Sequence, residues 1–204
     1  MNLKIRNFLL VAIASGLVTG IAVAALNPGT SPILGFITSA VITALCVFLL
    51  QLAVEKLSAS RQITIAVFIA FFLRLIIGVL LFILLPSHGY DEPYNNNGYL
   101  YLDAYQRDLD AWQLSQSDAP IYAAFQEEFS TDQYGGLLTF SAAIYRYLSP
   151  DGHRPILILI LTSFFYAAGV PFFWNAIEKF WGKKTAHASV WIYALYPETI
   201  ILGA

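Results

Sequence analysis

Long apolar runs, each close to twenty residues, constrain the fold of this chain more than any other feature. Five of them can be delimited: residues 8–26, 32–54, 63–85, 155–177 and 186–204. A helix needs roughly 20 apolar residues to cross ~30 Å of hydrocarbon, and within lipid a helix satisfies its own backbone hydrogen bonds. The sequence therefore predicts an all-α protein, a polytopic transmembrane helical bundle of about five spans.

The composition supports this prediction and excludes other classes. Hydrophobic residues make up 58 % of the chain and charged residues 12 %, which lies outside the range of soluble globular proteins. A net charge of −2 leaves no basic surplus, so we expect no nucleic-acid partner. The single cysteine, Cys46, excludes an intrachain disulfide or a cysteine metal cluster. His88 and His153 lack the spacing of metal ligands.

Basic residues gather on one side of the membrane if the spans alternate in direction. They are Lys4, Arg6, Lys56, Arg61, Lys179, Lys183 and Lys184. By the positive-inside rule this side is the cytoplasm, so we expect a multi-pass protein of the plasma membrane with a cytoplasmic N-terminus. The first run can alternatively be a signal peptide, because basic residues precede it and small residues end it, but its length favours a span.

The long segment between the third and fourth runs, residues 87–153, is then extracytoplasmic. It carries many acidic residues and few arginines: Asp91, Glu92, Asp103, Asp108, Asp110, Asp118, Glu127, Glu128, Asp132 and Asp151 against Arg107, Arg146 and, at its boundary, Arg154. We divide the chain into two N-terminal transmembrane helices, residues 1–62, and a transmembrane core that includes this outer loop, residues 63–204.

Periodic patterns predict three amphipathic helices at the membrane surface within the outer loop. The first has an apolar and a charged face: Tyr101, Tyr105, Leu109 and Trp112 on one, Asp103, Arg107 and Asp110 on the other. The second follows Pro120, where Ile121, Phe125 and Phe129 repeat at four-residue spacing. The third covers residues 137–148, after a break at two glycines.

Arg74 lies near the middle of the third apolar run. An unpaired charge in hydrocarbon costs at least ~2.5 kcal/mol, so an ionisable residue at this depth indicates a functional site by default. The alternative is that Arg74 extends its charge towards the membrane surface or pairs with a neighbouring helix.

Five motifs, in this order along residues 63–204, carry a resemblance to a known family. They are FFLRLIIG at 71–78, YDE at 90–92, LDAYQRDLDAW at 102–112, TDQYGGLLTFSAAIYRYLSP at 131–150 and ALYPE at 194–198. Together they resemble the polytopic membrane glycosyltransferases of the GT-C superfamily, family 39 in particular. In many of those enzymes a helix with a mid-membrane Arg leads into an outer loop that holds a catalytic Asp, and the donor is a polyprenyl-phosphate sugar.

The resemblance implies a catalytic carboxylate in the outer loop. The acceptor hydroxyl must lose its proton as it attacks the anomeric carbon, and a positioned general base supplies about 10²–10⁴-fold in rate. Asp91 follows the helix of Arg74 closely, whereas Asp103 precedes Ala111 by eight residues, as in the helix that usually follows the catalytic Asp. We favour Asp103 and keep Asp91 as the alternative.

Binding the donor requires a cation, because the phosphate leaves as an anion. The candidates are Arg107, Arg146, Arg154 or a divalent cation; otherwise we expect no cofactor. Asp103 and Arg107 lie four residues apart and can instead form a surface ion pair.

Three further carboxylates are candidate substrate-binding residues. Glu92 belongs to the YDE motif. Asp132 can orient a sugar hydroxyl, although it can equally form a turn or helix cap. Glu198 lies in the outer part of the last span, where a carboxylate is costly unless it faces a polar cavity.

These observations together predict an integral-membrane glycosyltransferase, or the N-terminal part of one, because the chain stops directly after an apolar run. It would move a sugar from a polyprenyl-phosphate donor to a lipid, glycan or protein acceptor. The alternative is a non-enzymatic membrane scaffold or transporter fragment in which Arg74 and Glu198 pair within the bundle.

Overall fold

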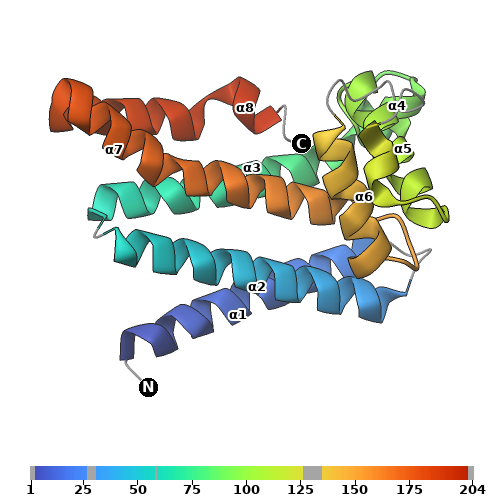
Figure 1. Ribbon diagram of the computed structural model, residues 1–204, viewed down its shortest axis with the longest axis horizontal. Helices are drawn as coiled ribbons and strands as arrows, with labels where there is room; N and C mark the ends of the chain where they lie inside the picture. Colours follow the sequence, from blue (N-terminus) through green and yellow to red (C-terminus); the bar gives the residue numbers. More distant parts are fainter. Residues whose placement is uncertain (1–2, 27–30, 58, 126–134, 202–204) are drawn as a thin grey trace. The chain divides into compact units, whose positions relative to one another are not determined.

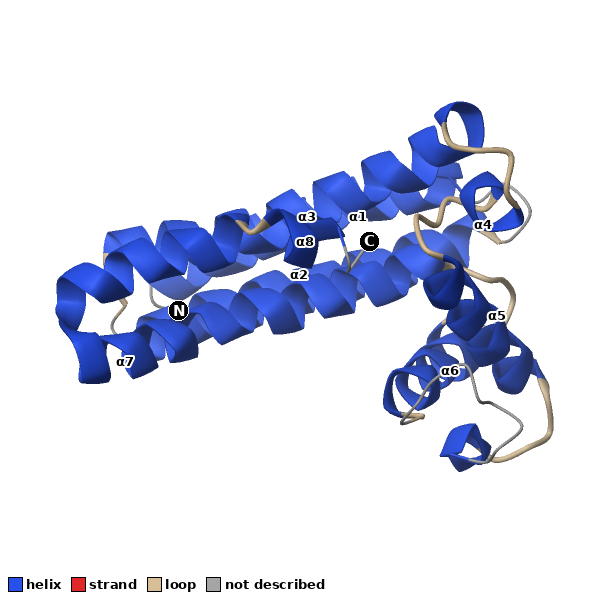
Figure 2. Cartoon of the chain, turned by 90° about the horizontal axis from the view of Figure 1, so that it is seen from above, coloured by secondary structure: helices blue, strands red, loops and turns tan. Residues whose placement is uncertain are grey.

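The computed structural model describes residues 3–26, 31–57, 59–125 and 135–201, and these form helices joined by turns (Figures 1 and 2). In chain order the elements are α1 (Leu3–Leu26), α2 (Pro32–Lys56), α3 (Arg61–His88), α4 (Pro93–Asn96), α5 (Leu102–Gln116), the 3-10 helix η1 (Ile121–Phe125), α6 (Gly136–Leu148), α7 (Pro155–Leu195) and α8 (Pro197–Ile201). None of the described residues belongs to a strand. The all-α prediction is confirmed.

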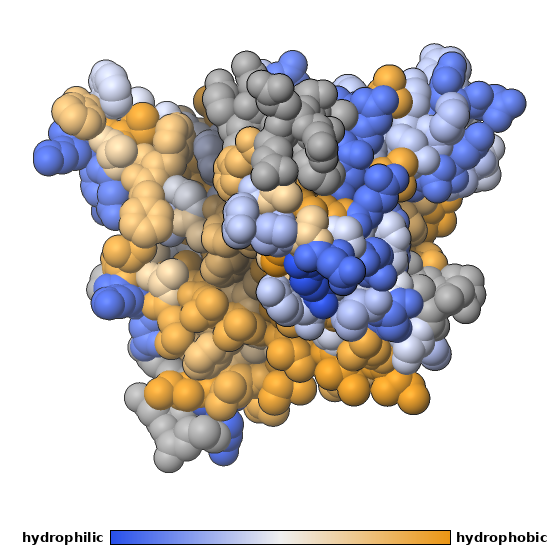
Figure 3. All heavy atoms as spheres, turned by 45° about the vertical axis from the view of Figure 1, so that its right-hand side comes forward, coloured by the Kyte–Doolittle hydropathy of each residue, from blue (hydrophilic) through white to orange (hydrophobic). Residues whose placement is uncertain are grey.

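Four helices, α1, α2, α3 and α7, are long and apolar enough to cross a membrane, as expected of a multi-pass membrane protein. Large apolar side chains remain exposed along them: Leu10, Val18, Ile21, Ile33, Val41, Leu45, Ile76 and Phe165 are among these. Figure 3 shows such apolar side chains, in orange, covering continuous areas of the face in view. A surface of this kind is stable against lipid tails and not against water.

The fourth and fifth apolar runs, residues 155–177 and 186–204, were predicted as separate spans. The fourth run and the fifth run up to Leu195 fall within α7, which is broken between them at Gly182, where φ is 81° and ψ is 167°. Figure 1 shows the chain reversing direction in α7. The two arms pack together, since the rings of Tyr166 and Tyr193 stack at 4.6 Å with an interplanar angle of 10°.

Beyond the second arm, the fifth run is interrupted at Tyr196, between α7 and α8. The physical reason is Pro197, which has no N–H to donate and disfavours helical geometry in the preceding residue. Residues 202–204 of this run lie outside the described part of the chain. A total of five spans stays a prediction.

The chain forms two compact units. Unit 1 comprises Met1–Val18, Ala40–Val79 and Leu159–Ala204, and unit 2 comprises Thr19–Ser39 and Leu80–Ile158. In unit 1, α1 approaches α2 closely at Gly16, where an added Cβ would lie 2.4 Å from the carbonyl oxygen of Ala40. Small residues at a helix contact allow such backbone approach in membranes. The predicted division at residue 62 stays a prediction.

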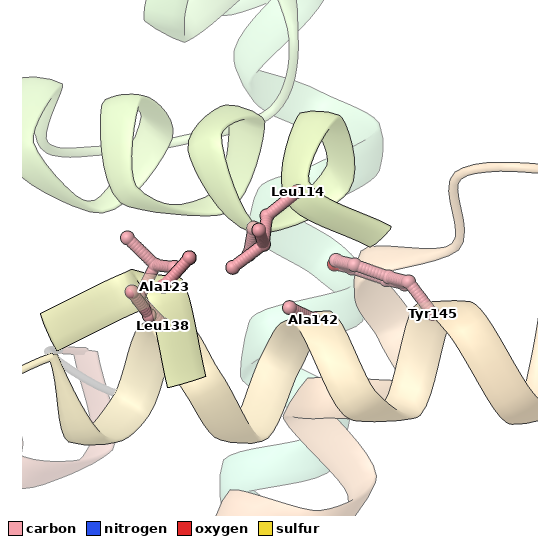
Figure 4. Close-up of a cluster of buried hydrophobic side chains, with 7 residues drawn as sticks. Leu114, Ala123, Leu138, Ala142 and Tyr145 are labelled. Carbon is pink, nitrogen blue, oxygen red and sulfur yellow. The ribbon is translucent and has the colours of Figure 1, made fainter. Parts of the chain in front are cut away.

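Unit 2 contains an apolar core formed by α5, η1 and α6 (Figure 4). Its buried members are Ala111, Leu114, Ala123, Ala124, Leu138, Ala142 and Tyr145. In Figure 4 the side chain of Leu114 extends from α5 into the space above Leu138 and Ala142 of α6. This core sets the relative positions of the three segments that carry the polar cluster described below.

The helices of the outer loop correspond in part to the predicted ones. Helix α6 lies within one residue of its predicted start, and η1 is shorter than the predicted second helix, whose Phe129 lies outside the described residues. That the apolar face of the first loop helix lies at the membrane surface stays a prediction. Tyr101, directly before α5, is 42 % exposed, and the buried face of α5 consists of Asp108, Ala111, Leu114 and Ser115. The core formed with α6 and η1 determines this face.

Replacing Gly182 by alanine should destabilise the hairpin of α7. Its backbone conformation is one that only glycine adopts readily, so we expect a cost of about 1–3 kcal/mol, measured by unfolding in detergent. Gly136→Ala is the matched control. At both glycines an added Cβ would have no heavy atom within 4 Å, and of these two residues Gly182 alone has a positive φ. Equal stability of the two variants would contradict the assignment of strain to residue 182.

Candidate functional site

A buried carboxylate, that of Asp108 on α5, is the centre of a polar cluster in unit 2. Asp108 is 9 % exposed. Its Oδ2 accepts hydrogen bonds from the Tyr99 hydroxyl and, at 2.6 Å, from Nε2 of His153, while its Oδ1 accepts one from the Tyr145 hydroxyl. A charged carboxylate in a low-dielectric site requires such donors, and three of them supply the stabilisation that water would otherwise provide.

Each partner of Asp108 is positioned by a local feature of the chain. Tyr99 follows Gly98, whose φ is 84°, and Asn95, which is buried and donates from Nδ2 to the Tyr99 carbonyl at 2.8 Å. The same Asn95 accepts from the backbone N–H of Tyr90 at 3.1 Å through Oδ1. Asn95 thus closes the turn that contains α4 and holds the backbone of Tyr99, whose hydroxyl contacts Asp108 of α5.

The other two partners come from α6 and from the turn before α7. Tyr145 is fully buried in the core of unit 2. The His153 ring stacks on Trp112 at 5.3 Å and meets the Tyr145 ring edge-on at 5.1 Å. The cluster therefore links four sequence segments within unit 2.

Electrostatics reinforce the direction of these hydrogen bonds. Burial, together with the nearby charge of Asp108, holds the pKa of Tyr99 well above its ordinary value. The same two causes, in the same order, raise the pKa of Tyr145. Both phenols therefore keep their protons at physiological pH and act as donors to Asp108.

Arg154, a predicted phosphate-binding residue, is fully buried and bound to groups of the protein. Its Nη1 and Nη2 donate to the two oxygens of Asp151 at 2.7 and 2.8 Å, a bidentate pair. They also donate to Ser149 Oγ at 2.6 Å and to the carbonyl of Ser31 at 2.9 Å. Asp151 in turn accepts from the Ser31 backbone N–H at 3.0 Å. The pair joins the turn before α7 to the start of α2.

Arg146, the second predicted cation, belongs to the last turn of α6, and its side chain contacts the C-terminal end of α5. It donates to the carbonyls of Leu114, Ser115 and Ser117, at 3.1 Å to Ser115 and 2.9 Å to Ser117. The last carbonyls of a helix have no partner within the helix, and a basic side chain that binds them stabilises the end. Arg107, the third predicted cation, is half-buried, and no partner is found for it among the described residues.

The two candidate bases are both exposed. Asp91 follows α3 and accepts a hydrogen bond at 3.1 Å from Nδ2 of Asn96. Asp103 lies in the first turn of α5, and within the described part of the chain it forms no ion pair with Arg107. Glu92 is exposed and precedes α4 without capping it through its side chain. Asp132 lies outside the described residues.

Arg74 and Glu198, both in unit 1, do not pair with each other. Arg74 is 9 % exposed; its Nη1 donates to the carbonyl of Thr199, and its guanidinium carbon lies 5.0 Å from the centre of the Tyr166 ring. Glu198 is exposed and accepts a hydrogen bond from the Tyr196 hydroxyl at 3.2 Å. The contact on which the scaffold alternative depended is therefore not formed.

No set of three or more acidic, histidine or cysteine side chains that could hold a metal ion occurs among the described residues. A divalent cation bound with the help of a substrate phosphate stays a prediction.

The sequence reasoning missed Asp108 and His153 as site residues. A signal for Asp108 exists, since positions 101, 105, 108, 112 and 115 follow the alternating four- and three-residue spacing of one helix face. An aspartate on an otherwise apolar helix face is either buried with hydrogen-bond partners, or the face has been assigned wrongly. No sequence pattern connects Asp108 with His153, because 45 residues separate them.

No family model, curated protein or solved structure matches this chain.

Replacing Asp108 by asparagine should destabilise the protein. The new amide places an N–H₂ donor among three donors and removes the charge, so we expect a loss of about 1.5–3 kcal/mol in unfolding free energy. Asp103→Asn, on the exposed face of the same helix, is the control and should change stability by less than about 0.5 kcal/mol. The two variants would be compared by thermal unfolding in one detergent, and equal shifts would contradict the buried network.

Acid should weaken the Asp151–Arg154 pair. The hydrogen bonds from Arg154 lower the pKa of Asp151 below its ordinary 3.8. The stability from this pair is thus fully present above that ordinary value and is lost as the pH falls through the lowered pKa. We expect the difference in melting temperature between wild type and Asp151→Asn to shrink as the pH falls below about 4. A difference independent of pH would contradict this, and Asp118→Asn, exposed in the same loop, is the control.

Proposed function

We propose that the protein is an integral-membrane glycosyltransferase that takes a sugar from a polyprenyl-phosphate donor at the extracytoplasmic face of the plasma membrane. The acceptor is a hydroxyl of a lipid, a glycan or a protein. The protein crosses the membrane about five times, with its N-terminus in the cytoplasm and the acidic loop on the outside. The resemblance of residues 63–204 to the GT-C superfamily is the origin of this proposal.

The observation that carries the proposal is the exposure of two carboxylates in the loop that follows the helix of Arg74. Asp91 and Asp103 both have access to solvent, and within the described residues neither is neutralised by a cation. Asp108 and Asp151, by contrast, are engaged by donors of the protein. Unpaired carboxylates at the end of a membrane span are available to a hydroxyl substrate.

The chemistry assigned to this site is a single displacement. As the acceptor oxygen forms its bond to the anomeric carbon, its proton passes to a base, and the bond from that carbon to the phosphate oxygen breaks. The phosphate leaves with the electron pair, so its charge must be offset. Arg107 is the preferred cation, because Arg146 and Arg154 already bind protein groups.

The proposal is tested by measuring sugar transfer from a mixed pool of polyprenyl-phosphate sugars. The expressed chain includes whatever coding sequence follows residue 204. Asp91→Asn and Asp103→Asn are compared with wild type after correct insertion has been verified. We expect one of them to lower the rate by about 10²-fold or more, because the carboxylate either positions the acceptor hydroxyl or takes up its proton.

Asp118→Asn is the matched control, since Asp118 is an exposed carboxylate of the same loop that the proposed reaction does not use. Full transfer by both Asp91→Asn and Asp103→Asn would refute the two carboxylates as site residues. Absence of transfer by the inserted wild type, with every donor and acceptor class supplied, would refute the glycosyltransferase itself.

A further inference from the structure

The hydrogen bonds to Asp108 determine where the protons of the His153 ring lie. Tyr99 and Tyr145 both donate to the carboxylate of Asp108, and an ionised carboxylate can only accept. Nε2 of His153 lies 2.6 Å from Oδ2 of that carboxylate. Two acceptors would repel at this distance, and Nε2 therefore carries a proton. In the neutral ring, the basic lone pair is then on Nδ1.

That lone pair is accessible. The His153 side chain keeps 27 % of its surface exposed, whereas the side chain of Asp108 behind it keeps 11 %. Among the described residues no group hydrogen-bonds to Nδ1, and this atom is not one of the buried polar atoms left without a partner. Nδ1 therefore keeps contact with solvent.

Three contacts fix the orientation of the His153 ring. Trp112 stacks on one face at an interplanar angle of 30°, and Tyr145 meets the ring at 72°. Rotation of the ring would break the bond to Asp108. The backbone is equally constrained, since the next residue is the fully buried Arg154 with its bidentate partner Asp151. A base held in this way needs no reorganisation before it accepts a proton.

The charged groups around His153 favour this role. Asp108 of α5 faces Nε2, and Tyr145 of α6 keeps its proton because burial and Asp108 raise its pKa. On the same turn, Asp151 and Arg154 neutralise each other. The remaining charge that faces the ring is that of Asp108, at Nε2.

We infer that Nδ1 of His153, oriented by Asp108, accepts the proton of the acceptor hydroxyl during glycosyl transfer. The substrate at this atom is an alcohol: its O–H bond breaks as its oxygen bonds to the anomeric carbon, and the phosphate leaves with the electron pair. His153 becomes an imidazolium and later returns the proton to water. This inference rests on the proposed function, and it gives Asp91 and Asp103 the task of binding the substrates.

The first experiment needs no activity. The chain has three histidines, so His88→Gln with His187→Gln leaves His153 alone for ¹⁵N NMR of the protein in detergent. We expect the Nε2–H tautomer near neutral pH. Asp108→Asn should reduce its population, because an amide oxygen is a weaker acceptor than a carboxylate, whereas Tyr99→Phe should leave it unchanged or raise it, because the carboxylate loses a competing donor. An Nδ1–H tautomer in the parent protein would overturn the inference.

The second experiment measures sugar transfer against pH. The wild-type rate should fall in acid with the same midpoint as the NMR titration of His153, because only the neutral ring is a base. His153→Gln should lower the rate by about 10²–10⁴-fold and abolish that dependence, whereas His88→Gln, an exposed histidine at the end of α3, should change neither.

The two proposals fail in distinguishable ways. A folded His153→Gln variant with full transfer and an unchanged pH profile would overturn the role of His153 and leave the glycosyltransferase standing. An inserted wild type that transfers no sugar would overturn the glycosyltransferase, and with it the catalytic role of His153, even where NMR reports the expected tautomer.

Discussion

The ionised carboxylate of Asp108 is the interaction on which the arrangement of unit 2 depends. It is buried, and its three donors come from the turn after α4, from α6 and from the turn before α7. A buried charge that loses a donor is strongly destabilising, so the segments that supply these donors are held to one geometry. The apolar core around Leu114 and Leu138 brings the helices together, and the carboxylate then selects their register.

The arginines of the chain illustrate how a charged residue type can serve different purposes. Arg146 satisfies the carbonyls at the end of α5, and Arg154 forms a buried bidentate pair. Arg74 is stabilised without a carboxylate, by a backbone carbonyl and the face of Tyr166. From the sequence, Arg146 and Arg154 were candidates for binding an anion, and Arg74 was expected to mark a functional site or to pair within the bundle. The partners available in the folded chain, and not the residue type, decide which cation remains for a ligand.

The sequence predicted the helices well where a single physical rule determines them. Apolar runs of about twenty residues can only be helical in lipid, so the boundaries of α2 and α3 could be placed within a few residues. The break at Gly182 lies between two runs that were predicted as separate spans, residues 155–177 and 186–204, although the sequence did not single out the glycine itself. Hydrophobicity indicated that α5 is amphipathic, but it did not indicate that Asp108 is buried, because this depends on a polar network with other segments.

The candidate site could be predicted less well than the fold, since it depends on contacts between distant residues. Asp91, Asp103 and Arg107 became candidates because their motifs resemble those of a known family, while the pairing of Asp108 with His153 crosses 45 residues and has no local signature. The same holds for Arg146, whose partners at the end of α5 lie about thirty residues earlier.

The contact of Asp151 with the backbone of Ser31 bears on how the protein is made. These residues are separated by 120 positions. During synthesis, the start of α2 emerges from the ribosome long before the turn that binds it, so α2 must enter the membrane with this end still solvated. Closure of unit 2 is consequently a late event of assembly, completed only after the segment leading into α7 has been translated.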